Sequence, residues 1–382
     1  MAKKNKFKLK YYINYIGVGL FLAITAIMMN YGYLNRSTAN LLTQIGYSVI
    51  LAVSLNLVVG FLGELSLGHA GFMCVGAYLG CYLAKYMYTF TNSPLLILIV
   101  SMLAGGIIAA VFGFIIGLPA LRLKGDYLAI VTLAFGEIVR TIFKNLETFG
   151  GALGLSTKKY GSDLFIVAFV VVLVMLFVVQ NLIRSKHGRA ITAIRDNEIA
   201  AKAMGINVTF YKLLVFVVSA FFAGIAGVIY GHYATPVLYS FFSYNYSIEI
   251  LVMVVLGGMG NISGSIIAAA LITYINFVLT TNLSGDLAAL KYLIYAIILI
   301  LMIIFNNAPA LKPLKEKLSA FEENLFKKIV SIFKKHEKDP ANINDDDAAW
   351  NRIPSKIDMD AILSVDVKNE VYEKKPKEKG DK

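Results

Sequence analysis

Charged side chains are scarce in this chain. Only 16% of its 382 residues are Asp, Glu, Lys or Arg, against about 25% in a typical soluble domain. Hydrophobic residues make up 58% and fall in runs of roughly 18 or more, the length that crosses a bilayer. No single aqueous core could absorb that excess. The composition therefore excludes soluble enzymes, nucleic-acid-binding proteins and secreted disulfide scaffolds, and it predicts an all-α polytopic membrane protein.

Cysteines and catalytic motifs are equally sparse. The only cysteines, Cys74 and Cys81, lie in one apolar run, where two helical turns would separate them by about 10 Å, too far for a disulfide. The four histidines fall in four separate segments. The sequence contains no His-Glu-x-x-His, Cys-x-x-Cys, Gly-x-Ser-x-Gly or phosphate-binding Gly-x4-Gly-Lys-Ser/Thr motif. We therefore expect no catalytic residues, no metal, no cofactor and no ATP site on this chain.

Apolar runs follow one another along most of the sequence. They cover Tyr11–Met29, Leu41–Val59, Leu65–Ala84, Leu95–Leu118, Tyr127–Phe143, Leu164–Ile183, Phe210–Tyr230, Tyr246–Leu256, Ile262–Thr280 and Leu287–Phe305. The first run is longer than the apolar region of a signal peptide and lacks a small-residue cleavage site, so we expect it to be retained. The pattern predicts about ten transmembrane helices, or eight or nine if short segments re-enter.

The distribution of charge predicts the orientation. Residues 1–306 hold 20 Lys and Arg but only nine acidic residues, whereas residues 307–382 are nearly neutral. With ten spans, the most basic loop, 184–212, lies on the same side as both termini. The positive-inside rule places that side in the cytoplasm. The net charge of +12 is thus interpreted as a topology signal and not as a nucleic-acid footprint.

Glycines gather in two clusters, at 60–72 and 257–264. One interpretation is close helix packing through small residues, as at Gly76-x-x-x-Gly80. The other is a pair of broken or re-entrant helices, whose irregular backbone is tolerated only beside protein or water. The sequence leaves both interpretations open.

The chain is predicted to divide near residue 306. Residues 1–306 form the transmembrane domain and residues 307–382 a charged cytoplasmic tail. Apolar residues at steps of three or four predict an amphipathic helix at about 310–336, which would lie at the lipid interface or pack on the spans. Beyond it, large apolar residues are too few to offset the entropy of ordering, so we expect disorder.

Ionisable residues inside apolar runs are the remaining functional candidates. Glu137 and Arg140 lie three apart on one helix face and can pair. They form either a neutralised pair that orients helices or part of a polar pathway. Asp126, just before the same run, is predicted to be the N-cap of this helix.

A basic segment between two spans, residues 187–207, predicts one short helix from about Ala190 to Ala203, closed by Gly205. Ile191, Ile194 and Ala201 would form an apolar ridge, with the charged residues beside it in solvent. Such a helix is either a surface loop or a knob that docks into a soluble partner.

Several stretches together resemble the LivM-type permeases of branched-chain amino acid ABC importers. They are Ser54-Leu-Asn-Leu-Val-Val-Gly60, Leu65-Ser-Leu-Gly-His-Ala-Gly-Phe72, Leu121-Arg-Leu-Lys-Gly-Asp-Tyr-Leu-Ala-Ile-Val-Thr132, Phe135-Gly-Glu-Ile-Val-Arg140, Ala193-Ile-Arg-Asp-Asn-Glu-Ile-Ala-Ala-Lys-Ala-Met-Gly-Ile-Asn207 and Ser247-Ile-Glu-Ile-Leu-Val-Met-Val-Val-Leu-Gly-Gly-Met-Gly260. The stretch from Glu198 to Gly205 looks like the Glu-Ala-Ala…Gly loop through which such permeases contact their ATPases. It departs by inserting Ile199 and by lacking the later Ile-x-Leu-Pro.

The resemblance, which spans roughly residues 45–280, implies a permease subunit in a bacterial cytoplasmic membrane. Its partners would be a second related permease, two ATPase subunits and an extracytoplasmic solute-binding protein, and the ATP sites would lie on the ATPases. Leucine, isoleucine and valine are the implied substrates, but urea, short-amide and other amino acid permeases share much of the pattern. An ion-coupled secondary carrier is the rival class of transporter, and a non-transporting membrane scaffold is a third reading.

The resemblance also suggests site residues. Those expected to couple to an ATPase, in a helix at about 190–205, are Arg189, Ile191, Ile194, Arg195, Asp196, Glu198, Ala200, Ala201 and Gly205. Those expected along the translocation pathway are Ser66, His69, Thr132, Glu137 and Arg140.

Overall fold

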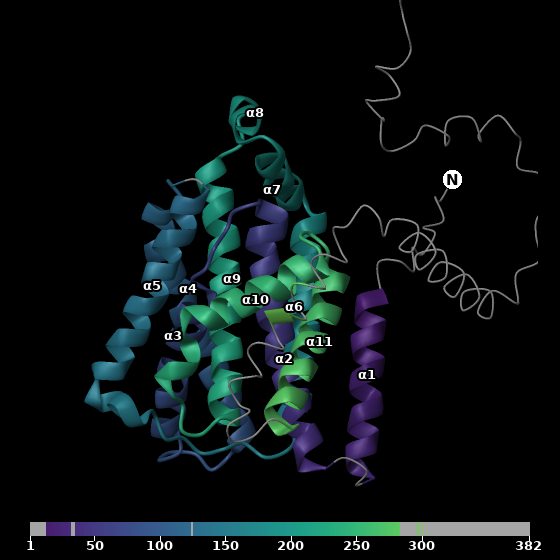
Figure 1. The fold of residues 1–382 in the computed structure, drawn as a ribbon, viewed down its shortest axis with the longest axis vertical. Helices are drawn as coiled ribbons and strands as arrows, with labels where there is room; N and C mark the ends of the chain where they lie inside the picture. The colour runs from purple at the N-terminus through teal and green to yellow at the C-terminus, as the bar shows by residue number, and fades with distance from the viewer. Residues whose placement is uncertain (1–12, 32–34, 124, 283–295, 298–299, 301–382) are drawn as a thin grey trace, which may run out of the picture. The chain divides into compact units, whose positions relative to one another are not determined.

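The computed structural model describes residues 13–31, 35–123, 125–282, 296–297 and 300, and that part of the chain is helical (Figure 1). Its α-helices are α1 (Ile13–Asn30), α2 (Arg36–Asn56), α3 (His69–Met87), α4 (Pro94–Ala120), α5 (Asp126–Asn145), α6 (Leu164–Arg184), α7 (Lys186–Asp196), α8 (Glu198–Ala203), α9 (Val208–Tyr233), α10 (Tyr244–Gly257) and α11 (Ile262–Asn282). A single β-bridge, Leu155 to Val237, is recorded among these residues. The structure thus supports an all-α membrane protein.

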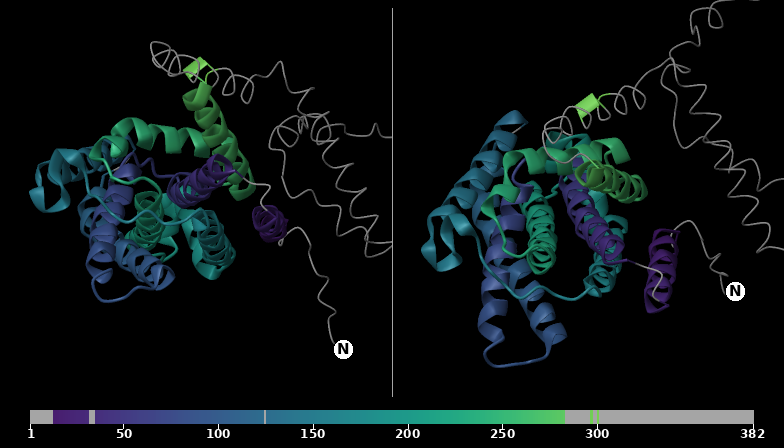
Figure 2. Two further views of the ribbon diagram at one scale, coloured as in Figure 1. Left: turned by 90° about the horizontal axis from the view of Figure 1, so that it is seen from below. Right: turned by 60° about the horizontal axis from the view of Figure 1, so that its bottom comes forward.

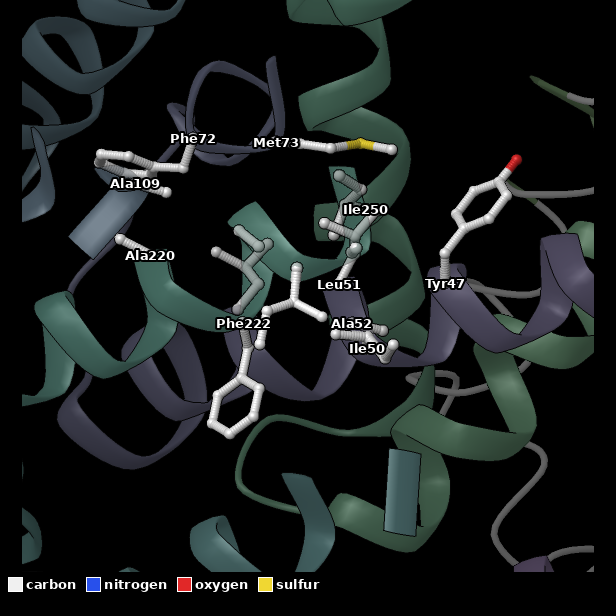
Figure 3. Packing of buried hydrophobic residues seen from close by; sticks show 14 of the residues in the cluster. Tyr47, Ile50, Leu51, Ala52, Phe72, Met73, Ala109, Ala220, Phe222 and Ile250 are labelled. Carbon is white, nitrogen blue, oxygen red and sulfur yellow. The ribbon is translucent and has the colours of Figure 1, made fainter. Parts of the chain in front are cut away.

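Helix α2 is the central element. It contacts α6, α9, α10 and α11, and residues from Tyr47 to Asn56 are all buried. Figure 3 shows Ile50, Leu51 and Ala52 of this helix packed in the core, with Ile250 of α10 close by. An apolar helix in a membrane can be covered by protein or by lipid, and the half of α2 from Tyr47 to Asn56 is covered by protein.

Helices α3, α4 and α9 pack against one another through glycines. A Cβ atom on Gly76 of α3 would overlap the Gly224 carbonyl oxygen of α9, and one on Gly227 would overlap the Met73 carbonyl oxygen. A Cβ on Gly80 would overlap Val228 Cγ2 of α9 and would lie 3.0 Å from the Ser101 carbonyl oxygen of α4. The predicted small-residue packing at Gly76 and Gly80 is therefore confirmed.

Five helical segments in the described part of the chain are long and apolar enough to cross a membrane. They are Arg36–Leu62, Pro94–Ala120, Leu164–Arg184, Val208–Tyr233 and Ile262–Thr281. Helix α1 is a shorter apolar helix that packs against α6, on the side of the bundle away from α5 (Figure 2). The count of ten spans and the cytoplasmic termini stay predictions. The predicted span Leu287–Phe305 lies mostly outside the described residues, and the tail 307–382 lies wholly outside them.

Both glycine clusters contain breaks between helices. After α2 the chain forms a π-helical turn, Leu57–Leu62, and residues 64–68 are not helical, so α3 begins at His69 and not at the predicted Leu65. Gly63 has a φ of +81°, which ends the turn in a conformation that other residues rarely adopt. The second break separates α10 from α11 at residues 258–261.

Two local predictions are wrong. Asp126 is the first residue of α5 and not its N-cap, which is Gly125; its charge there still favours the helix N-terminus. The single helix predicted over 190–203 is two helices, because Asn197 is extended, ends α7 and accepts a hydrogen bond from Ala200 N as the N-cap of α8. Gly205, with a φ of +81°, closes α8 as predicted.

Candidate functional site

Polar contacts concentrate at the end of the bundle that carries α7 and α8, at the top of Figure 1. We call this cluster the junction. It comprises Asn56, Gly60, Glu64, Arg195, Glu198, Lys212, Gly260 and Asn261. These residues join both helix breaks to α7, α8 and the start of α9.

Asn56 holds the two breaks together. Its side chain is fully buried at the end of α2. Its amide nitrogen donates to Asn261 O at 3.2 Å and to Ser265 Oγ at 2.8 Å, and its amide oxygen accepts from Gly260 N at 2.9 Å. The π-helical turn brings Gly60 so close to Gly260 that a Cβ on Gly60 would overlap Gly260 N. Because its acceptor and donor groups are both used, Asn56 fixes the second break against α2.

Arg195 links α7 to the first break. Its Nη1 donates to Gly60 O at 3.2 Å, and its side-chain stem lies against Gly63, where a Cβ would be 2.7 Å from Arg195 Cγ. A π-helical turn disturbs the regular i to i−4 ladder, so its carbonyl groups need other partners. Arg195 also pairs with Asp196 at 3.0 Å, but that pair is exposed and adds little stability.

Lys212 links the first break to both α8 and α9. Its side chain is only 4% exposed, and its Nζ lies 2.5 Å from Glu64 Oε1 and 3.3 Å from Glu198 Oε2. A buried ammonium group is costly unless carboxylates accompany it, so these three side chains stabilise the fold as a unit. Glu198 was expected to contact an ATPase, but its carboxylate pairs with Lys212 of the same chain.

The apolar ridge predicted on this segment faces inward. Ile191, Ile194 and Ala201 are all buried in the core of this chain. The solvent-exposed apolar side chains are instead Ile199 and Met204, at 78% and 82% exposure. Of the other predicted coupling residues, Arg189, Asp196 and Ala200 are exposed.

Three of the predicted pathway residues support the first break. Ser66, His69 and Thr132 are buried. Thr132 Oγ1 accepts from Leu67 N at 3.0 Å, which binds the non-helical stretch to α5, and His69 Nε2 lies 2.8 Å from Ser54 Oγ of α2. The Thr132 contact satisfies a backbone N–H group of the non-helical stretch, and the His69 contact joins the start of α3 to α2.

Glu137 and Arg140 form the predicted ion pair, with Nη2 to Oε2 at 2.8 Å. The other carboxylate oxygen of Glu137 accepts from Tyr244 N, the first residue of α10, at 3.0 Å. A carboxylate at a helix N-terminus is favourable because the terminal N–H groups carry partial positive charge. The pair therefore links α5 to α10, as its helix-orienting interpretation requires.

A cavity of about 950 Å³ lies between α2, α9, α10 and α11. It is lined by Gln44, Tyr47, Ser48, Tyr233, Ser240, Phe241, Ser243, Asn245, Tyr246, Ile248, Glu249, Val252, Thr273, Asn276, Phe277, Thr280, Thr281 and Ala296. Its volume falls in the range of about 300–1,000 Å³ that small-molecule sites occupy. None of the five predicted pathway residues lines it.

Sequence reasoning missed most of the residues that the structure brings together. All of them are polar residues within long apolar helices: Gln44 and Asn56 in α2, Lys212 in α9, and Thr273 and Asn276 in α11. The available signal was their polarity inside an apolar run. Glu249 also interrupts an apolar run, but its partner in α11, Asn276, is not visible from the sequence.

Comparison with known proteins shows which family this chain belongs to. Residues 37–303 match the family described as "Branched-chain amino acid transport system / permease component". The chain is 35% identical to the high-affinity branched-chain amino acid transport system permease protein LivM of Salmonella typhimurium over 308 residues, 71% of this chain and 69% of the relative. It is 27% identical to the probable LivM of Methanocaldococcus jannaschii, over 70% and 90% of the two chains.

More distant relatives include the ribose import permease protein RbsC of Haemophilus influenzae, 24% identical over 77% of this chain and 92% of the relative. The family thus extends to permeases named for a sugar. No solved structure matches this chain.

Proposed function

Because this chain belongs to the branched-chain amino acid transport permease family, we propose that it is the membrane-spanning permease subunit of an ATP-driven importer for leucine, isoleucine and valine. The observation that carries this proposal is the family match over residues 37–303 together with 35% identity to a LivM protein. The cavity among apolar helices, one of which contributes a carboxylate, supports a role in moving a small polar solute.

The importer contains further subunits, because the relatives of this chain are named as components of transport systems. A second, related permease stands beside this chain in the bacterial cytoplasmic membrane. Two ATPase subunits bind on the cytoplasmic side, and a solute-binding protein delivers substrate from outside. The most basic connection, residues 184–212, carries α7 and α8, which supports placing that end of the bundle in the cytoplasm.

The α7–α8 segment is the element that contacts an ATPase. Ile199 and Met204 are the docking side chains, since a large apolar group more than three-quarters exposed is suited to burial in a partner. Ile191, Ile194 and Ala201 act from within, by holding the segment to this chain's core.

The junction transmits ATPase movement to the spans, and the importer works by alternating access. A displacement of α7 acts on Gly60 through Arg195, and Asn56 passes it to the start of α11. Packed helices joined by such bonds have discrete arrangements, and two of these would open the pathway to opposite sides of the membrane.

Uptake by reconstituted vesicles tests the proposal. Vesicles that contain the whole assembly should take up leucine only when ATP and the solute-binding protein are both present. If the vesicles take up urea or a short amide but not leucine, the protein is still an ATP-driven importer, but the proposed substrate is wrong. Uptake by this chain alone, driven by an ion gradient, would overturn the proposal in favour of a secondary carrier.

A further inference from the structure

The outer side of α6 is an exposed stripe that changes character along its length. Val170, Val174 and Phe177 are exposed at helical spacing, and the exposed Asn181 follows one turn later. Because α6 is long and apolar enough to cross a membrane, the apolar part of this stripe is the surface that lipid acyl chains cover. The stripe becomes polar only in the last turn of α6, where a membrane-spanning helix reaches the bilayer surface.

Two cations follow that stripe at once, in the first turn of α7. Lys186 and Arg189 are exposed and lie three positions apart, so they share one face of the helix. The turn before them is fixed by Ser185, whose hydroxyl accepts from two N–H groups in the first turn of α7 at 3.1 and 3.4 Å. A Cβ on Gly188 would overlap the Ile183 carbonyl oxygen, so the first turn of α7 packs directly on the last turn of α6. We call Lys186, Arg189 and the adjoining end of α6 the corner.

The corner carries positive charge that the surrounding sequence does not balance. Residues 164–195 contain no Asp or Glu. The ion pairs recorded in the described part of the chain include neither Lys186 nor Arg189. Arg184 adds a third cation at the end of α6, but it has a further interaction of its own, so we assign the binding charge to Lys186 and Arg189. A surface of this kind attracts an anionic group.

We propose that the corner binds the headgroup of an anionic phospholipid, whose acyl chains lie along the apolar stripe of α6. Lys186 and Arg189 pair with the headgroup phosphate. A bilayer lipid presents its anionic group directly beside its hydrocarbon, which is the order of cations and apolar stripe along this surface. A zwitterionic lipid carries its own cation next to the phosphate, so it gains less from these two side chains. This binding goes beyond the proposed importer function and requires neither its substrate nor an ATPase.

Quenching of a single tryptophan by brominated lipids tests the site in the full chain. The chain has one tryptophan, Trp350, so Val174→Trp in a Trp350→Phe background places the sole fluorophore on the α6 stripe. In phosphatidylcholine vesicles, quenching by added brominated phosphatidylglycerol should show at least threefold higher affinity than quenching by brominated phosphatidylcholine. Adding Lys186→Gln and Arg189→Gln should remove that preference. Both side chains are exposed, so the variant should still fold.

Helix α4 supplies the matched control. Val111 is 51% exposed on an apolar stripe of α4, as Val174 is 54% exposed on α6. Val111 lies eleven positions before the cation Arg122, and Val174 lies twelve before Lys186. The connection after α4 differs in charge, because the exposed Asp126 accompanies Arg122 there. Val111→Trp in the same background should therefore show no preference for phosphatidylglycerol, and Arg122→Gln should leave the preference on α6 unchanged.

Four results would overturn the proposal. The first is equal affinity for the two lipids on α6, or a preference that survives both substitutions at the corner. The second is the same preference on α4, which would assign lipid selection to the membrane surface in general. The third is loss of the preference in inorganic phosphate but not in chloride of equal ionic strength, which would assign the corner to a free anion. The fourth is a double variant that keeps the lipid preference but no longer co-purifies with an ATPase, which would make the corner a protein contact.

Discussion

The junction and the cavity share helices α2 and α9, and they use their polar groups in opposite ways. At the junction, Asn56 bonds two backbone groups of the second break and the Ser265 hydroxyl of α11, and Lys212 has two carboxylate partners. At the cavity, the nearly buried hydroxyl of Thr273 has no partner in the described part of the chain. A satisfied polar network is rigid, whereas an incomplete one has bonding capacity left for something else. The comparison separates a region whose polar groups are bonded from one that has bonding capacity left over.

The two regions are also close enough to be linked. Ser48 at the cavity and Asn56 at the junction are eight residues apart on α2, a rise of about 12 Å. Thr273 at the cavity and Ser265, which bonds Asn56, are eight residues apart on α11, the same rise. Two helices, α2 and α11, therefore run from one region to the other.

The largest effect on the fold should come from Lys212→Met. It strands the carboxylate of Glu64, whose side chain is 13% exposed, and it removes a partner of Glu198. We expect a loss of about 3–5 kcal/mol in stability, measured as loss of folded protein in a thermal series. Lys202→Met, the same change on exposed α8, is the control. Adding Glu64→Gln to K212M should recover part of the loss; if it recovers none, the ion pair is not what holds this region.

A smaller loss is expected for Asn56→Ala. It removes the partner of the Gly260 N–H, of the Asn261 carbonyl and of the buried Ser265 hydroxyl, which should cost about 1–3 kcal/mol. Thermal unfolding of the purified chain measures it. Asn145→Ala removes an exposed amide that bonds only the preceding turn at Thr141 O, and it should change stability by less than about 0.5 kcal/mol. Equal stability in the two variants would contradict the role given to Asn56.

Glu137→Gln should have a modest effect. The neutral amide can still accept from Tyr244 N but loses its attraction to Arg140 and to the N-terminus of α10, together about 1 kcal/mol. A double-mutant cycle with Arg140→Gln separates the ion pair from the helix-terminus contribution. If E137Q instead abolishes uptake at unchanged stability, Glu137 belongs to the pathway after all.

The smallest effect on the fold should come from Met204→Glu, because this side chain is 82% exposed. Its stability should stay within about 0.5 kcal/mol of the unchanged chain, while transport-coupled ATP hydrolysis should fall at least tenfold if Met204 docks on an ATPase. Ala201→Asp, three positions away but buried, should instead lower the stability of this chain. Normal coupling in M204E would exclude this face as the docking surface.

The sequence was enough to predict the features that depend on neighbouring residues: most helices, both helix breaks and one ion pair. The apolar runs gave most helices to within a few residues, since an apolar run of bilayer length has little alternative to a helix. The glycine clusters marked both helix breaks, and Gly205 ended α8, because glycine alone adopts positive φ without strain. The pairing of Glu137 with Arg140 followed from their spacing of three on a helix.

The sequence could not predict which face of a helix packs against which other helix. Ile191, Ile194 and Ala201 would form a ridge on one continuous helix. Only the packing of α7 and α8 against α6, α9 and the π-helical turn Leu57–Leu62 shows that these side chains face the core and leave Met204 outside. Glu249 and Asn276 lie 27 residues apart, and Asn56 and Gly260 lie 204 apart, so no local pattern connects them. Helix propensity and the length of an apolar run are properties of neighbouring residues in the sequence, so they could be predicted from it. The junction and the cavity exist only where distant helices meet, because their contacts depend on tertiary packing.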